Sequence, residues 1–134
     1  MAKDRLVYTK KAVVEKREKP EIERLLKEWQ TRLNLNDWEI VAYDECSPID
    51  MKTQGVCGEN EWDEVNKGSN IKIISEKDYG DRLLPFDKEE ILVHELLHIK
   101  FSLLWNGDNS LQDRIVHQLI EEMAKSLVDA KRSI

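Results

Sequence analysis

The run His94-Glu95-Leu96-Leu97-His98 contains the residue types that bind and use a zinc ion. In a helix, two histidines four residues apart lie on one face, one turn apart, where their imidazole nitrogens can share a metal. The intervening Glu95 is then beside a metal-bound water, whose pKa zinc lowers toward about 7. We therefore expect His94 and His98 to be zinc ligands and Glu95 to be the catalytic base.

A catalytic zinc usually takes three protein ligands, so another element should supply one more. The third and last histidine of the chain is His117, nineteen residues after His98. Glu121 follows one helical turn later, where it can orient the His117 ring as a carboxylate partner. Two alternatives remain open, in which Glu121 or Glu122 is itself the third ligand. The other interpretation is that His94 and His98 are partly buried structural residues, held by ordinary hydrogen bonds.

Two helices must carry these side chains. Asp87 with Glu90 resembles a capping box before an apolar run, and Asn106-Gly107 is typical of a helix end, which predicts a helix over about 88–105. Its residues are apolar on most sides, which indicates a central helix. Ser110 with Asp113 predicts the start of an amphipathic helix to about 130, with His117 at the margin of its apolar stripe.

The motif and its spacing resemble zinc metallopeptidases of the gluzincin type, and in size the minimal, SprT-like and small phage-encoded metallopeptidase-like proteins. The resemblance covers roughly residues 20–130. Here His117 and Glu121 stand where thermolysin-like gluzincins have a glutamate ligand and an aspartate. A histidine as third ligand is more similar to the SprT-like group. The resemblance implies a zincin-like fold, a Zn²⁺ cofactor and a phage or prophage origin.

The same resemblance implies peptide hydrolysis. In such peptidases the edge strand of a small sheet holds an extended peptide across the zinc, and residues 70–75 are the expected edge strand. A further side chain stabilises the oxyanion, and Tyr79 is the candidate because every histidine is already assigned. A loop tyrosine is more often a packing residue.

The rest of the sequence predicts elements that support this pair of helices. Pro20 opens a helix to about residue 33, expected on the far side of the sheet from the metal helix. Strands are expected over residues 37–43, 54–62 and 70–75, with a bulge at the glycines of the second. Strands that precede helices, rather than alternate with them, predict an α+β fold. Residues 20–134 should form one domain after a basic segment, 1–19.

The composition bears on where the protein is located and what it binds. The 134 residues are 40% hydrophobic and 36% charged, and no apolar run is long enough for a membrane span or a signal peptide, so we expect a cytoplasmic protein. Cys46 and Cys57 are expected to be free thiols. A net charge of −6 disfavours general nucleic-acid binding, although the basic segment keeps it possible.

We therefore expect a zinc-dependent peptidase that acts on a peptide or protein substrate. The alternative is a non-hydrolytic zinc-binding module with a regulatory or structural role. A second alternative is a nucleic-acid-associated factor that uses residues 1–19.

Overall fold

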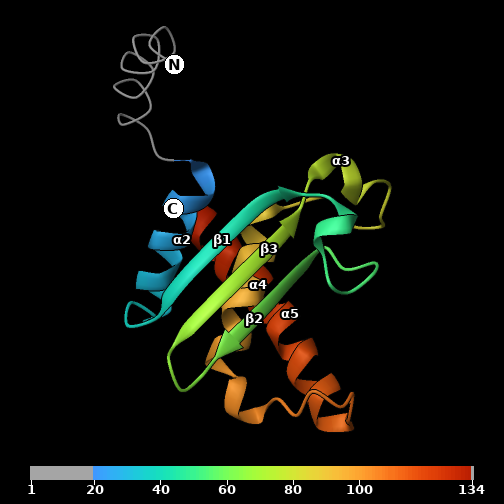
Figure 1. Ribbon diagram of the computed structural model, residues 1–134. Coiled ribbons are helices and arrows are strands. Elements are labelled where there is room, and N and C mark those ends of the chain that lie inside the picture. Colours follow the sequence, from blue (N-terminus) through green and yellow to red (C-terminus); the bar gives the residue numbers. More distant parts are fainter. Residues whose placement is uncertain (1–19, 134) are drawn as a thin grey trace, which may run out of the picture.

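The computed structural model describes residues 20–133, and the basic segment 1–19 lies outside them. The described chain is α+β, as predicted, with four α-helices and one three-stranded sheet (Figure 1). None of its helices combines the length and the apolar character that crossing a membrane requires. Both cysteines are free thiols. The elements are α2 (Glu21–Arg32), β1 (Glu39–Cys46), β2 (Gly58–Asp63), β3 (Gly68–Ile74), α3 (Glu76–Tyr79), α4 (Lys88–Lys100) and α5 (Leu111–Arg132).

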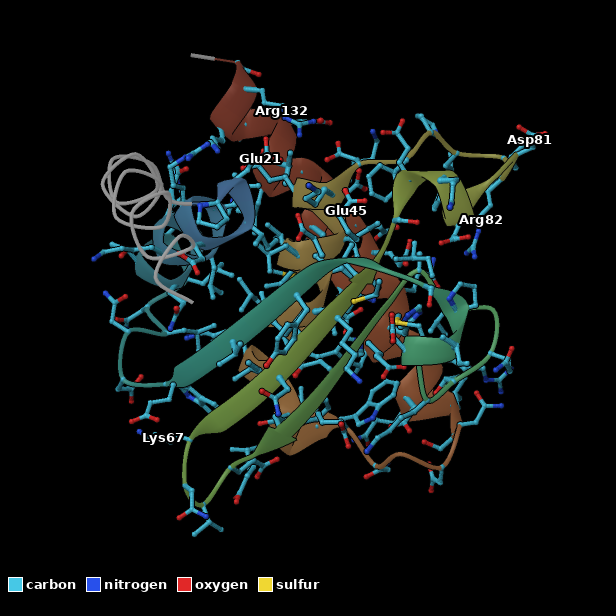
Figure 2. The ribbon with its side chains drawn as sticks, turned by 45° about the horizontal axis from the view of Figure 1, so that its top comes forward. Glu21, Glu45, Lys67, Asp81, Arg82 and Arg132 are labelled. Atoms are coloured by element: carbon cyan, nitrogen blue, oxygen red, sulfur yellow. The ribbon has the colours of Figure 1, made fainter. Side chains whose placement is uncertain are left out.

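The strand over residues 70–75 is central, so its prediction as the edge strand was wrong. The sheet order is β1-β3-β2, with β1 parallel and β2 antiparallel to β3. A tight turn at Lys67 joins β2 to β3 as a hairpin (Figure 2), which leaves the other side of β3 for β1. Ile71 and Ile73 are accordingly fully buried. The strand that has a free edge beside α4 is β2.

The irregularity expected in the second strand occurs in the first instead. The β1–β3 register shifts between Tyr43 and Cys46, and Glu45 adopts a left-handed φ of 55° there (Figure 2). Gly55 has a φ of 80° but lies in the loop before β2. The bulge therefore bends the end of β1 and leaves β2 regular along its pairing with β3.

All the long helices lie on one face of the sheet (Figure 1). Helix α4 contacts β2 and β3 on one side and α5 on the other, which explains why its sequence is apolar almost all round. Helix α2 packs against β1 and α4 and shares their core, so its predicted place on the far side of the sheet was wrong. Burial of α4 fixes the helix that carries the metal motif.

The helix that carries His94 and His98 ends earlier than predicted. Helix α4 stops at Lys100, and Ser102–Leu104 form a separate 3-10 turn. Two of the apolar residues that extended the prediction, Leu103 and Leu104, are exposed, whereas Phe101 and Trp105 pack against the core. Gly107 has the expected positive φ of 76°, but it lies in the loop between the helices. The turn and the loop bring Trp105 back toward the metal motif.

A buried carboxylate, Glu89, ties the three long helices together. It accepts a hydrogen bond from Trp29 Nε1 at 2.7 Å and pairs with Lys131 at 2.5 Å and Arg132 at 3.2 Å. Arg132 (Figure 2) also donates to both carboxylate oxygens of Asp87, at 2.7 and 3.0 Å. Asp87 is the N-cap of α4, and its side chain accepts from the Glu90 backbone as predicted. This network fixes the start of the metal helix.

We expect Glu89→Gln to lower the free energy of unfolding by about 2 kcal/mol at neutral pH. Burial raises the pKa of Glu89, but hydrogen bonds from Lys131 and Trp29 outweigh it and hold the pKa below its ordinary value of 4.5. Glu89 therefore binds a proton more readily in the unfolded state than in the folded state. Its contribution to the free energy of unfolding is present above about pH 4.5 and is lost as the pH falls through the lowered pKa of the folded state.

Urea unfolding at about pH 7 and about pH 3.5 measures this effect, and wild type should lose more stability on acidification than Glu89→Gln. The matched control is Glu28→Gln, because Glu28 also pairs with Lys131, at 3.0 Å, but is far more exposed. Its expected effect is below about 0.5 kcal/mol. Equal acid sensitivity of wild type and Glu89→Gln would contradict the assigned role of the Glu89 charge.

Candidate metal centre

Helix α4 supplies two imidazoles from successive turns. His94 is partly buried, and His98 is only 9% exposed. Burial, and then the neighbouring His98 and His117, lower the pKa of His94 to about 3. Burial, and then His117, lower the pKa of His98 to about 4. Both rings are therefore neutral at physiological pH, which is the form that binds a metal.

The third imidazole comes from the first half of α5. The Ser110 side chain caps this helix by accepting from the Asp113 backbone, as predicted. The Asp113 carboxylate is 1% exposed and accepts backbone hydrogen bonds from Asn106 at 2.7 Å and Asp108 at 3.0 Å. These bonds fasten the loop between α4 and α5. Helix α5 therefore begins at a fixed place, and His117 is held close to the metal helix.

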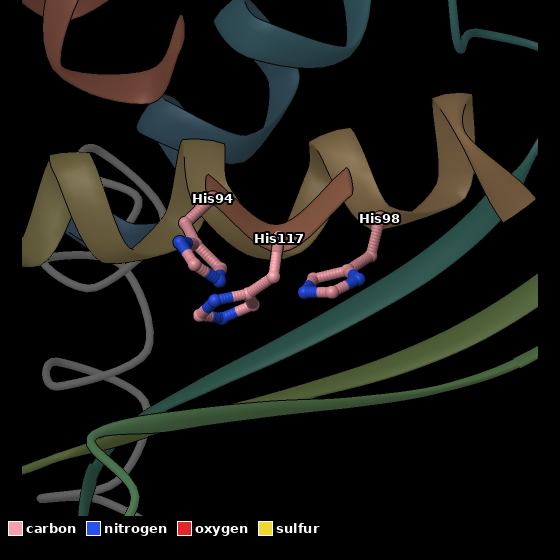
Figure 3. A group of neighbouring side chains, drawn as sticks. All are labelled: His94, His98 and His117. Carbon is pink, nitrogen blue, oxygen red and sulfur yellow. The ribbon is translucent and has the colours of Figure 1, made fainter. Parts of the chain in front are cut away.

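The three histidines converge, as predicted (Figure 3). One nitrogen from each lies within 4.8 Å of the others. The ring centroids are 5.1 Å apart for His94 and His98, 4.9 Å for His94 and His117, and 5.8 Å for His98 and His117. Four ligands at the zinc–nitrogen distance of about 2.0–2.1 Å are separated by about 3.4 Å in a tetrahedron. Small ring rotations therefore suffice to hold an ion.

Glu121 contacts a different histidine from the one expected. Its Oε1 lies 3.3 Å from Nδ1 of His94, not beside the ring of His117. A carboxylate on one imidazole nitrogen favours the tautomer that leaves the other nitrogen free for a metal. Glu121 is therefore placed to orient His94. Among residues 20–133, the group of side chains that can share an ion consists of the three histidines, which favours His117 over Glu121 or Glu122 as third ligand.

Glu95 lies between α4 and β2. It is 7% exposed, and its backbone carbonyl accepts a hydrogen bond from the Asn60 side chain at 2.9 Å. No donor from residues 20–133 reaches its carboxylate; burial, and then the charges of Glu59 and Glu121, raise the pKa of Glu95 to about 8. A proton acceptor works best when its pKa is near the working pH. The carboxylate thus has little exposure, has no hydrogen-bond donor among residues 20–133 and follows His94 directly in sequence.

Gly58 makes room for the Glu95 side chain, a requirement that the sequence did not reveal. A Cβ atom at Gly58 would lie 3.1 Å from Oε2 of Glu95 and 2.7 Å from Cγ2 of Ile91. The second distance is shorter than real Cβ contacts allow, so any larger residue would force the Ile91 side chain, α4 or β2 to shift. Gly58 therefore sets the distance between the metal helix and the strand.

Tyr79, the candidate for oxyanion stabilisation, is engaged elsewhere. Its hydroxyl donates to the Leu84 carbonyl at 2.7 Å, and its ring meets Phe86 edge to face at 5.3 Å. The Arg82 guanidinium lies over the Tyr79 ring, with Cζ 4.9 Å from the ring centroid. These contacts favour the packing role.

An open hollow of about 590 Å³ adjoins His117 on the α5 side. His117 and Glu121 form part of its wall, together with Trp105, and the remaining lining residues are Asn109, Asp113, Arg114, Gln118 and Glu122. The space available to a ligand here lies beside His117 on the α5 side.

Comparisons with protein-family models, curated proteins and solved structures found no match for this chain. The donor set of the chain itself is what bears on the metal. Three neutral imidazoles suit zinc among the divalent ions, whereas Mg²⁺ and Ca²⁺ prefer oxygen ligands. The residues present therefore fit the zinc ion expected from the motif.

Proposed function

We propose that the protein is a zinc-dependent peptidase with a zincin-like catalytic domain. One observation supports this most: three imidazoles converge, and Glu95, the residue after His94, is buried and accepts no side-chain hydrogen bond from residues 20–133. Structural zinc sites are usually closed by four protein ligands, whereas catalytic sites keep one position open. In residues 20–133 no fourth Cys, His, Asp or Glu joins the group, which supports a catalytic rather than a structural site.

His94, His98 and His117 would hold the ion. When bound, zinc supplies a Lewis acid that polarises a peptide carbonyl and lowers the pKa of a water molecule. Glu95 takes the proton of the attacking water at its carboxylate and passes it to the leaving amine. Glu121 keeps the His94 ring oriented through Nδ1, and the covered position of Glu95 limits competing water.

We place the peptide substrate along β2. Ile74 N donates to the Cys57 carbonyl at 2.9 Å, which fixes the antiparallel alternation of β2. By that alternation the backbone groups facing away from β3 belong to Gly58, Asn60 and Trp62. The side chains of Asn60 and Trp62 contact α4, since Asn60 donates to the Glu95 carbonyl and the Trp62 ring stacks on His98. An extended peptide paired with this edge would run beside the metal helix.

The test is metal content together with hydrolysis. We expect about one zinc per chain in dialysed protein by elemental mass spectrometry, and cleavage of a quenched-fluorescence peptide library. A chelator should abolish cleavage, and added zinc should restore it. Absence of zinc after reconstitution would refute the proposal. Zinc without cleavage of peptides or of unfolded protein would favour the non-hydrolytic zinc-binding module.

A further inference from the structure

His98 is enclosed by two tryptophans from different parts of the chain. The Trp62 indole, on β2, stacks on the imidazole at 6.1 Å between centroids with an interplanar angle of 24°. The Trp105 indole, after the 3-10 turn, meets the imidazole edge to face at 5.0 Å and 81°. The four tryptophans of the chain thus include two in contact with one metal-motif histidine.

His94 and His98 differ in what orients them. His94 has the Glu121 carboxylate at its second nitrogen. Within residues 20–133, no carboxylate or carbonyl accepts a hydrogen bond from the His98 ring, and its neighbours are aromatic rings. An imidazole without a hydrogen-bonded partner can still be fixed when its rotation about the side-chain torsions would collide with packed rings.

We propose that Trp62 and Trp105 are positioning residues that hold the His98 ring in its metal-binding orientation. This inference rests on the proposed zinc site. It adds that the two indoles do for His98 what a hydrogen-bonded carboxylate or carbonyl usually does for a ligand histidine. Both indoles are themselves placed by the fold. Trp62 lies in the β2–β3 pairing opposite Ser69, and Trp105 N donates to the Ser102 carbonyl at 3.1 Å.

The proposal also explains the early end of α4. The chain leaves the helix at Phe101 and makes one 3-10 turn, which places Trp105 against the edge of His98 rather than further along the helix. Trp105 also lines the hollow beside His117, so it lies near both histidines that come from different helices.

The experiment measures zinc affinity in Trp62→Leu and Trp105→Leu, which keep apolar bulk but lose the ring. Zinc affinity is obtained by competition with a chromogenic chelator, and ligand geometry from the visible absorption spectrum of the Co²⁺-substituted protein. Each variant should bind zinc about tenfold more weakly, the size of effect that loss of a ligand's partner produces, and should change the Co²⁺ spectrum. Trp62→Phe and Trp105→Phe should restore most of the affinity.

Trp38→Leu is the matched control, because Trp38 is also partly buried and packs on the core without contacting a histidine. Thermal unfolding of the zinc-free proteins shows how much each change loosens the fold. Wild-type zinc affinity and Co²⁺ spectra in both leucine variants would overturn the inference, as would equal losses in Trp38→Leu. Either result leaves the proposed function standing if wild type binds zinc. A wild type without zinc would remove the function and the inference together.

Discussion

Replacing Glu95 by Gln is expected to lower the turnover number by about 10²–10⁴-fold, while zinc content and fold stay as in wild type. Glutamine keeps the shape that fits beneath Gly58 but cannot accept the proton of the attacking water. Glu95 accepts no hydrogen bond from residues 20–133, so the change breaks no described contact of its carboxylate. The loss should therefore fall on catalysis and not on structure.

Turnover of a peptide substrate, zinc per chain and urea unfolding are measured on the same preparations. Glu90→Gln is the matched control: Glu90 lies on the same helix, is partly buried and has a pKa raised by burial, but belongs to no group of metal-binding side chains. Its turnover should match wild type. Undiminished turnover in Glu95→Gln would show that Glu95 is not the base. Normal zinc with no change of any kind would favour a purely structural site.

The convergence of the three histidines was largely predictable because its determinants are local. Spacing of four residues in a helix fixes the relation of His94 to His98, whatever the rest of the fold does. The side chains of Asp87 and Ser110 cap their helices as expected, so the two elements that carry the histidines begin where the sequence indicates. His117 reaches His94 and His98 because helices α4 and α5 pack against each other.

Long-range pairing was not predictable in the same way. Alternation within a strand says which side chains share a face, but not which strand lies beside it. The central position of β3 leaves a trace only in Ile71, Ile73 and Ile74, all of them buried. Glu121 stands one turn after His117, yet it meets His94, because the crossing of α4 and α5 decides which ring it reaches.

Close approach between elements was equally hidden from the sequence. Gly58 was interpreted as a bulge residue, whereas its role is to admit Glu95 and Ile91 against β2. The end of α4 was overestimated because apolar residues after Phe101 continue the helical pattern although the backbone changes to a 3-10 turn. For Gly58 the deciding contacts come from residues far away in the chain.

His117→Ala is expected to weaken zinc binding by more than about 100-fold, beyond the range typical for losing the partner of a ligand. His117 is exposed, unlike His98, so the change should move the free energy of unfolding of the zinc-free protein by less than about 0.5 kcal/mol. Loss of metal would then report a lost ligand and not a lost fold.

Zinc per chain after dialysis and competition with a chelator give the affinity, and Glu121→Gln is the companion variant. Because Glu121 contacts Nδ1 of His94 at 3.3 Å, its loss should weaken binding about tenfold, less than the loss of a ligand. If Glu121→Gln or Glu122→Gln instead abolished binding while His117→Ala retained it, the third ligand would be acidic. The donor set would then be that of the thermolysin-like gluzincins, with His117 left as a wall of the hollow beside the metal.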